Sequence, residues 1–168
     1  MISKKRDMQT SLDIKEPGLN ILPLGVERHV VNGGGLTGIQ IFPDDEIEII
    51  NDEGNQICEI SVFNKNGKSE LSILNLKENK DSSEIKKILS KKDEASFVTS
   101  YQLKKRNLDI NKSKSAIVFD QDASLGEKIK LISKDKCYCI FAAPGADMLI
   151  HEQNPTTNLT VFVKRANI

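Results

Sequence analysis

The feature that most constrains this chain is a series of short apolar segments separated by turns too short to hold a helix. In the first third their apolar residues alternate with polar ones, as in the run from Glu46 to Ile49. Such alternation is typical of strands with one buried face. Parallel strands need a crossover of a dozen or more residues, so these segments must pair antiparallel. We expect an antiparallel meander with strands at 27–31, 36–42, 46–50 and 56–63.

The turns between these segments carry residues with special backbone preferences. Gly33, Gly34 and Gly35 remove the steric limits that side chains impose, and the run from Pro43 to Asp45 suits a tight turn. A dinucleotide-binding loop would need a helix after its glycines, whereas a strand pattern follows them here. We therefore interpret the three glycines as a hairpin turn or a bulge.

The middle third changes character, and strand patterns return near the end. Residues 81–84 can cap a short helix that carries Ile85, Ile88 and Leu89, and 99–107 is predicted as a second helix. The segment 136–143 is almost wholly apolar, which predicts a central strand covered on both faces. The other expected strands are 116–119, 127–132 and 159–164. The pattern predicts a mainly β fold, a β-sandwich or a barrel of antiparallel sheets, with one or two short helices.

Length and composition favour one globular domain. Residues 1–20 show no helical or strand period, so we expect an N-terminal arm followed by a single β-rich domain over 21–168. The 24 basic and 24 acidic side chains cancel, which argues against a nucleic-acid partner. The chain shows no apolar run of about 20 residues and no secretory signal pattern. We expect a cytoplasmic protein without a membrane partner, and a homo-oligomer is compatible with its strands.

The three cysteines are the candidates for metal chemistry. Cys137 and Cys139 lie two apart in a predicted strand, so their side chains share a face, and Cys58 and His151 are the additional candidate zinc ligands. Structural zinc sites usually draw cysteine pairs from turns, and buried cysteine also packs as a small apolar residue. We favour core packing and keep zinc as the alternative. The sequence carries no nucleophile elbow, P-loop or metalloprotease motif, so the catalytic residues are unknown.

A locally basic segment covers residues 103–115. A solvated loop is the simpler interpretation, and a clamp for a phosphate or carboxylate is the alternative. Its cations are Lys104, Lys105, Arg106, Lys112 and Lys114, against the single Asp109.

Parts of the chain resemble known families. The run 42–49 followed by 52–59, with Asn55 and Gln56, resembles the core motif of the urea-carboxylase-associated family. Residues 25–35 and the stretch from Ala142 to Leu159 resemble the N-terminal module of bacterial glycine-cleavage T-protein-like (aminomethyltransferase) proteins, a module that itself looks like a shortened relative of the first family. Together these likenesses cover about 25–63 and 127–165.

The resemblance implies a non-catalytic accessory β-domain that serves docking or substrate access in one-carbon transfer. The chain would be an excerpt of a longer aminomethyltransferase-like protein, which would use tetrahydrofolate, or a stand-alone unit. This domain would hold no cofactor, and its partner would be the adjacent catalytic domain or subunit. The ligand-binding or structural positions would be Gly33, Gly34, Gly35, Asn55 and Gln56.

Two other functions stay open. One is a small metal-dependent hydrolase or deiminase that uses Cys58, Cys137, Cys139 and His151, although the chain lacks the His-Asp dipeptide of the deiminase-type family members. The other is a small-ligand-binding β-barrel, because closed or half-closed sheets often leave an apolar cavity.

Overall fold

The computed structural model describes residues 22–145 and 155–167, so the expected arm, residues 1–20, lies outside the described part. The described residues form eight strands, two α-helices and two short 3₁₀ helices, and the predicted mainly β fold class is confirmed. The helical elements are η1 (Leu71–Leu74), α2 (Ser83–Leu89), α3 (Glu94–Lys105) and η2 (Ile110–Lys112). The strands are β1 (Val26–Val31), β2 (Leu36–Ile41), β3 (Glu46–Asn51), β4 (Cys58–Asn64), β5 (Ser115–Val118), β6 (Lys128–Ile132), β7 (Cys137–Ala142) and β8 (Leu159–Lys164).

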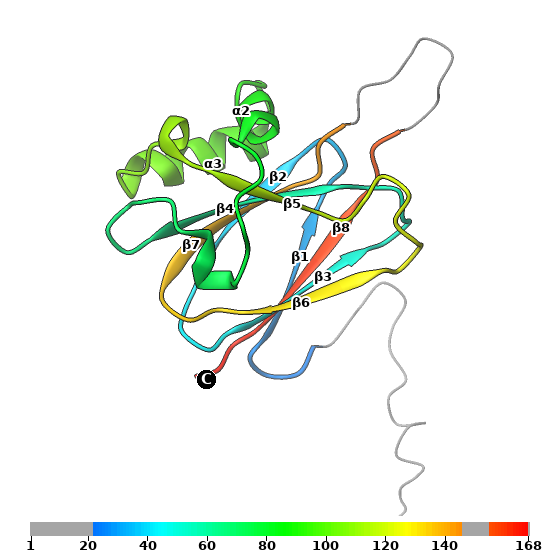
Figure 1. Cartoon of the computed structure of the whole chain (residues 1–168), viewed down its shortest axis with the longest axis horizontal. Coiled ribbons are helices and arrows are strands. Elements are labelled where there is room, and N and C mark those ends of the chain that lie inside the picture. The colour runs from blue at the N-terminus through cyan, green and yellow to red at the C-terminus, as the bar shows by residue number, and fades with distance from the viewer. Residues whose placement is uncertain (1–21, 146–154, 168) are drawn as a thin grey trace, which may run out of the picture.

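The strands form two four-stranded antiparallel sheets that face each other across a common core (Figure 1). Their orders are β1-β8-β3-β6 and β2-β7-β4-β5, so the fold is a sandwich and not a barrel. All strand pairs are antiparallel, as predicted, but the expected meander is wrong. β2, β3 and β4 each lie in the opposite sheet from the strand before them. Their connections of four to six residues are long enough to cross the roughly 10 Å between packed sheets.

Alternation along the strands divides the buried side chains between two clusters. The first fills the space between the sheets, and the second lies between one sheet and the helices. β7 contributes to both: Cys139 and Phe141 face the first cluster, whereas Tyr138 and Ile140 face the second. Every residue of β7 is buried, so the prediction of a central strand covered on both faces is confirmed.

The helices α2 and α3 cover the outer face of the β2-β7-β4-β5 sheet (Figure 1). The helix predicted near residue 81 is confirmed as α2. α3 begins at Glu94, five residues earlier than the predicted 99–107, because Asp93 caps it: the Asp93 carboxylate accepts the Ser96 N–H at 2.9 Å. No helix in the described ranges is long and apolar enough to cross a membrane.

Candidate functional site

The three glycines form the turn that carries the chain from β1 in one sheet to β2 in the other, so they do not close a hairpin. Gly34 has a φ of +79°, which side chains disfavour, and its N–H donates to the Ala143 carbonyl at 2.7 Å. A Cβ on Gly33 would lie 2.8 Å from the backbone carbon of Thr156. The Gly33 N–H donates to Asn158 Oδ1 at 2.9 Å. Close backbone contacts therefore account for glycine in this turn.

Gln56 and Asn55 satisfy backbone groups at the start of β4. The Gln56 side chain is buried; its Nε2 donates to the Pro144 carbonyl at 2.8 Å and its Oε1 accepts the Thr157 N–H at 2.9 Å. Asn55 has a left-handed backbone with a φ of 58°, and its N–H donates to the Ala123 carbonyl at 2.9 Å. Gln56 thus fixes the turn through its side-chain amide, whereas Asn55 contributes through its left-handed backbone.

The structure brings the predicted ligand-binding or structural positions, the glycine turn and Gln56, together at one end of the sandwich. The glycine turn contacts Ala143 and Thr156, and Gln56 bridges Pro144 and Thr157. Both features therefore contact the two ends of the connection between β7 and β8. The space beside Gln56 holds about 10 Å³, at most the room for one water molecule. At this end the described residues form a packed junction.

A larger depression of about 670 Å³ lies between the glycine turn and α3. Lys91 borders it and donates from Nζ to the Gly34 carbonyl at 2.9 Å. The N-terminus of α3 also borders it, but the carboxylate of Asp93 already caps that helix end. A phosphate would meet this negative charge, so the glycine turn and α3 do not form a phosphate cradle.

A buried carboxylate beneath α2 was not predicted from the sequence. Glu59 in β4 has no exposed surface; its Oε1 accepts the Ile85 N–H at 2.8 Å and its Oε2 accepts the Ser115 hydroxyl at 3.0 Å. Burial raises the pKa of Glu59, and these two hydrogen bonds oppose the rise. In the sequence Glu59 alternates with apolar neighbours, a pattern that is typical of a solvent-facing position. In the structure α2 covers this face of β4 and buries the side chain.

Four buried serines extend the contacts of Glu59. The Ser82 N–H donates to Ser115 Oγ at 2.9 Å, and the Ser82 hydroxyl lies 2.7 Å from that of Ser61 and 2.6 Å from that of Ser113. The four residues are at most 2% exposed. This network joins β4, β5 and the start of α2 beneath the surface, where it stabilises the packing of α2.

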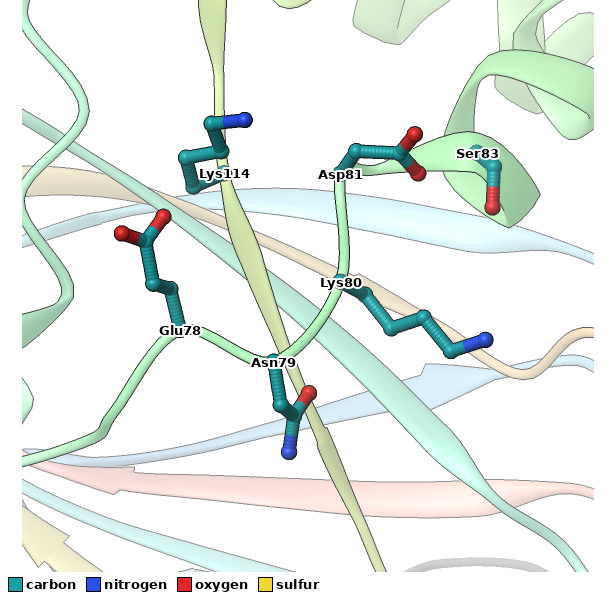
Figure 2. Close-up of a pocket in the computed structure, with 6 residues that line it drawn as sticks. All are labelled: Glu78, Asn79, Lys80, Asp81, Ser83 and Lys114. Carbon is teal, nitrogen blue, oxygen red and sulfur yellow. The ribbon is translucent and has the colours of Figure 1, made fainter.

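Beside α2 an open depression of about 650 Å³ reaches the surface (Figure 2). Figure 2 shows the carboxylates of Glu78 and Asp81 on either side of Lys114, whereas Asn79 and Lys80 point away. A hydrogen bond with the Ser83 side chain lowers the pKa of Asp81. Charges of both signs already face each other here on an open surface, so ionic binding at this depression would be weak. It is lined by Glu78, Asn79, Lys80, Asp81, Ser83 and Lys114.

The three candidate zinc-ligating cysteines lie in the core between the sheets. The Sγ atoms of Cys137 and Cys139 are 3.6 Å apart on one face of β7, as strand alternation predicts. Burial raises the pKa of Cys58 and of Cys139, which keeps both as thiols at neutral pH. His151 lies outside the described residues. Within residues 22–145 and 155–167, no three His, Cys, Asp or Glu side chains are placed to hold a metal ion.

An ion-pair cluster after β8 was also not predicted. Arg165 donates to both oxygens of Glu27 at 2.8 and 2.9 Å and to Asp45 Oδ2 at 2.7 Å. The hydrogen bonds from Arg165 hold the pKa of Glu27 below its usual range, and His29 Nε2 lies 3.0 Å from Glu27 Oε1. The cluster ties the chain after β8 to β1 and to the turn before β3, so it is a structural contact.

The cations of the basic segment 103–115 lie on different surfaces. Lys114 borders the depression of Figure 2. Arg106 instead lies over the ring of Tyr138, with 4.7 Å between the guanidinium carbon and the ring centroid, and its Nη1 donates to Gln40 Oε1 at 2.8 Å. The segment is therefore not one clamp.

Comparison with known proteins relates the chain to an enzyme. No family model matches the chain. A curated trimethylamine-oxide aldolase from Ruegeria pomeroyi is 29% identical over 153 residues, which is 91% of this chain. The chain spans about a fifth of that protein's length, 19%.

This similarity corrects the interpretation drawn from the sequence. The resemblance to the urea-carboxylase-associated family and to the module of aminomethyltransferase-like proteins is wrong, because the curated match is a trimethylamine-oxide aldolase, a different family. The functions expected from the sequence are wrong for the same reason. They were an accessory role in one-carbon transfer, a metal-dependent hydrolase or deiminase, and a small-ligand-binding barrel. Tetrahydrofolate in a parent protein, which that resemblance implied, and zinc, which was the alternative to core packing of the cysteines, both stay untested.

Turn chemistry explains the mistaken resemblance. Asp44, Asn55 and Gly54 all have positive φ angles, 68°, 58° and 78°. Asp, Asn and Gly are the residues that adopt this backbone region at low cost, so any sandwich with such turns selects them. These residues therefore report turn geometry and not family. Over nearly its whole length, this chain is similar to a segment that makes up about one fifth of a trimethylamine-oxide aldolase.

Proposed function

We propose that this chain is a β-sandwich unit of an aldolase-type enzyme that cleaves an amine oxide, with trimethylamine oxide as the substrate to test. The observation that carries the proposal is the similarity over 91% of the chain, which includes strands of both sheets. A likeness limited to a few turns would not extend so far. The unit corresponds to a fifth of the enzyme, so the substrate is to be tested with the remaining parts present.

The proposed chemistry needs no added oxidant, because the substrate carries its own oxygen. In trimethylamine oxide the N–O bond and one C–N bond break, and the released carbon forms a C=O bond with the oxygen. One hydrogen of that methyl group ends on nitrogen. The atoms balance as formaldehyde plus dimethylamine, which are the two products to measure.

Exposed apolar residues on α3 support a contact with the rest of such an enzyme. Phe97, Val98 and Tyr101 are 63%, 55% and 61% exposed, whereas the buried side of the same helix includes the small polar residues Ser96 and Thr99. A group of large apolar side chains exposed together on a surface typically marks an interaction site, whereas single exposed apolar residues are common. We assign this surface to the remaining four fifths of the aldolase-type enzyme, the partner that the length of the relative implies.

A replacement experiment tests the proposed function. Three proteins are compared: the intact Ruegeria aldolase, the same protein without the segment that this chain matches, and a chimera in which this chain replaces that segment. Each is incubated with trimethylamine oxide, and dimethylamine and formaldehyde are quantified. We expect the shortened protein to be inactive and the chimera to form both products.

Folding of the chimera is checked by circular dichroism and by its melting transition. A folded chimera that forms neither product contradicts the proposal. If the chimera does not fold, the purified chain is added to the shortened protein. Formation of both products in that mixture supports the proposal, and formation of neither contradicts it.

A further inference from the structure

A pocket of about 440 Å³ lies between the end of α3, the turn after β4 and the start of β7. Three of its lining residues are cations, Lys65, Arg106 and Lys136. None of the residues that line the pocket is Asp or Glu. The whole chain has equal numbers of basic and acidic residues, and the depression of Figure 2 carries both signs of charge. Cations without carboxylates therefore distinguish this pocket from the depressions beside α2 and beside the glycine turn, which are lined by charges of both signs.

Arg106 is held in position within this pocket. Its guanidinium lies over the Tyr138 ring, and Gln40 Oε1 accepts a hydrogen bond from its Nη1 at 2.8 Å. Gln40 is itself fixed, because its Nε2 donates to the Cys137 carbonyl at 2.7 Å. An arginine that is ordered before a ligand arrives loses less conformational freedom on binding.

The Tyr138 ring can lie beneath Arg106 because residue 38 is a glycine and leaves room for it. A Cβ at Gly38 would clash with the Tyr138 hydroxyl and would lie 2.6 Å from Cζ. Tyr138 is 5% exposed, so the ring has little room to move aside. Residues from β2 and β7 thus combine to position one guanidinium, an arrangement that a merely solvated arginine does not need.

Nearby carboxylates leave Arg106 available. Asp135 lies 4.0 Å from Lys65 Nζ, but both side chains are about half exposed or more, so the pair is weak. Glu70 accepts a hydrogen bond from the Asn64 side chain at 2.8 Å. Among the described residues, the hydrogen-bond acceptor of the Arg106 guanidinium is the neutral amide of Gln40. The other N–H groups of the Arg106 guanidinium remain for a ligand.

We propose that this pocket binds a small oxyanion, the carboxylate or phosphate group of a small molecule, through the guanidinium of Arg106. A guanidinium donates parallel hydrogen bonds to such groups, and Lys65 adds positive charge. The clamp considered for residues 103–115 is thereby reduced to one cation of that segment, joined by Lys65 from the turn after β4. The site is open to solvent, so its dissociation constant is on the order of 1 mM. This proposal does not depend on the aldolase chemistry.

Nuclear magnetic resonance titration of the ¹⁵N-labelled chain tests the site, with inorganic phosphate and malonate as separate probes at constant ionic strength. The amides of Gly67 and Asn107, which line the pocket, should shift and saturate. Arg106→Gln should weaken binding about tenfold or more. Lys104→Gln, which makes the same charge change in the last turn of α3, two residues before Arg106 and outside the pocket lining, should weaken binding less than about twofold.

Arg106→Lys separates hydrogen-bond geometry from charge. It keeps the positive charge but loses the planar donor pair, so binding should weaken about fivefold or more. Saturation with phosphate, malonate or both supports the proposal and identifies the preferred oxyanion. Shifts that stay linear to roughly 50 mM with both probes overturn it. Equal losses in Arg106→Gln and Lys104→Gln, or wild-type affinity in Arg106→Lys, overturn it as well. Arg106 is exposed, and melting curves check that each variant is folded.

Discussion

Replacement of Glu59 tests the packing beneath α2. The side chain is fully buried, and its two oxygens accept the Ile85 N–H and the Ser115 hydroxyl. Glu59→Ala removes both acceptors. Glu59→Gln keeps the size of the side chain and an acceptor for the Ile85 N–H, but it removes the charge and changes the contact with Ser115.

The two variants should differ clearly in stability. Glu59→Ala should lower the free energy of unfolding by about 3 kcal/mol, because two buried donors lose their acceptors and each unsatisfied group costs about 1–3 kcal/mol. Glu59→Gln should cost about 1 kcal/mol or less at neutral pH, because the lost hydrogen bond is offset by removal of a buried charge. Urea unfolding followed by circular dichroism measures both values.

The pH dependence separates the charge of Glu59 from its hydrogen bonds. Burial raises the pKa of Glu59 above its ordinary value of 4.5, so between pH 4.5 and the raised pKa the folded protein binds more protons than the unfolded chain. The stability from Glu59 is then complete below about pH 4.5 and is lost as the pH rises through the raised pKa. The advantage of the wild type over Glu59→Gln should therefore grow as the pH falls from about 7.5 to about 5, by at most about 1.4 kcal/mol per unit.

The same unfolding experiment contains the result that refutes this reasoning. An advantage that stays constant between about pH 5 and pH 7.5 would mean that the pKa of Glu59 is not raised. An advantage that shrinks as the pH falls would mean that the Ile85 N–H and the Ser115 hydroxyl favour the ionised form more than burial opposes it.

Three further predictions follow from particular contacts. Gly38→Ala should lower the free energy of unfolding by about 2–3 kcal/mol, because its Cβ meets the buried Tyr138 ring, and the urea midpoint measures the loss. Gln56→Leu should cost about 2–3 kcal/mol, because it leaves the backbone groups that this buried amide satisfies without a partner; thermal melting checks this, and an unchanged melting temperature would contradict it. Cys137→Ala or Cys139→Ala should each cost about 1 kcal/mol, and a chelator that lowers the melting temperature of the unmutated chain by more than about 8 °C would show that bound metal stabilises the fold.

Strand positions could be predicted from the sequence because burial of one face leaves a period of two. Seven of the eight expected strands overlap the observed ones with ends within one residue, and the remaining expected strand, 56–63, begins two residues before Cys58. Alternation shows which face of a strand is buried, but it does not show which strand lies beside it. The pairing of β1 with β8 joins segments more than 120 residues apart, and no local pattern encodes that contact.

The sequence pointed to turn residues of the candidate site but not to their contacts. Turn residues such as Asn55 and Gln56 were identified by their types, but their partners lie far along the chain, as with Thr157, 101 positions from Gln56. Glu59 alternates with apolar residues as a solvent-facing residue would, and its burial depends on where α2 packs. Arg106 was one of five equivalent cations until the structure placed it on Tyr138. These features depend on tertiary contacts, which residue type and spacing do not specify.

Product stoichiometry in the chimera described above tests the central proposal most directly. Cleavage of trimethylamine oxide by an aldolase-type reaction forms one formaldehyde for each dimethylamine, with no added oxidant or reductant. We predict equal amounts of the two products from the chimera and neither product from the shortened aldolase. Dimethylamine without an equal amount of formaldehyde, or a folded chimera that forms neither, would contradict the proposal that this sandwich is a unit of such an enzyme.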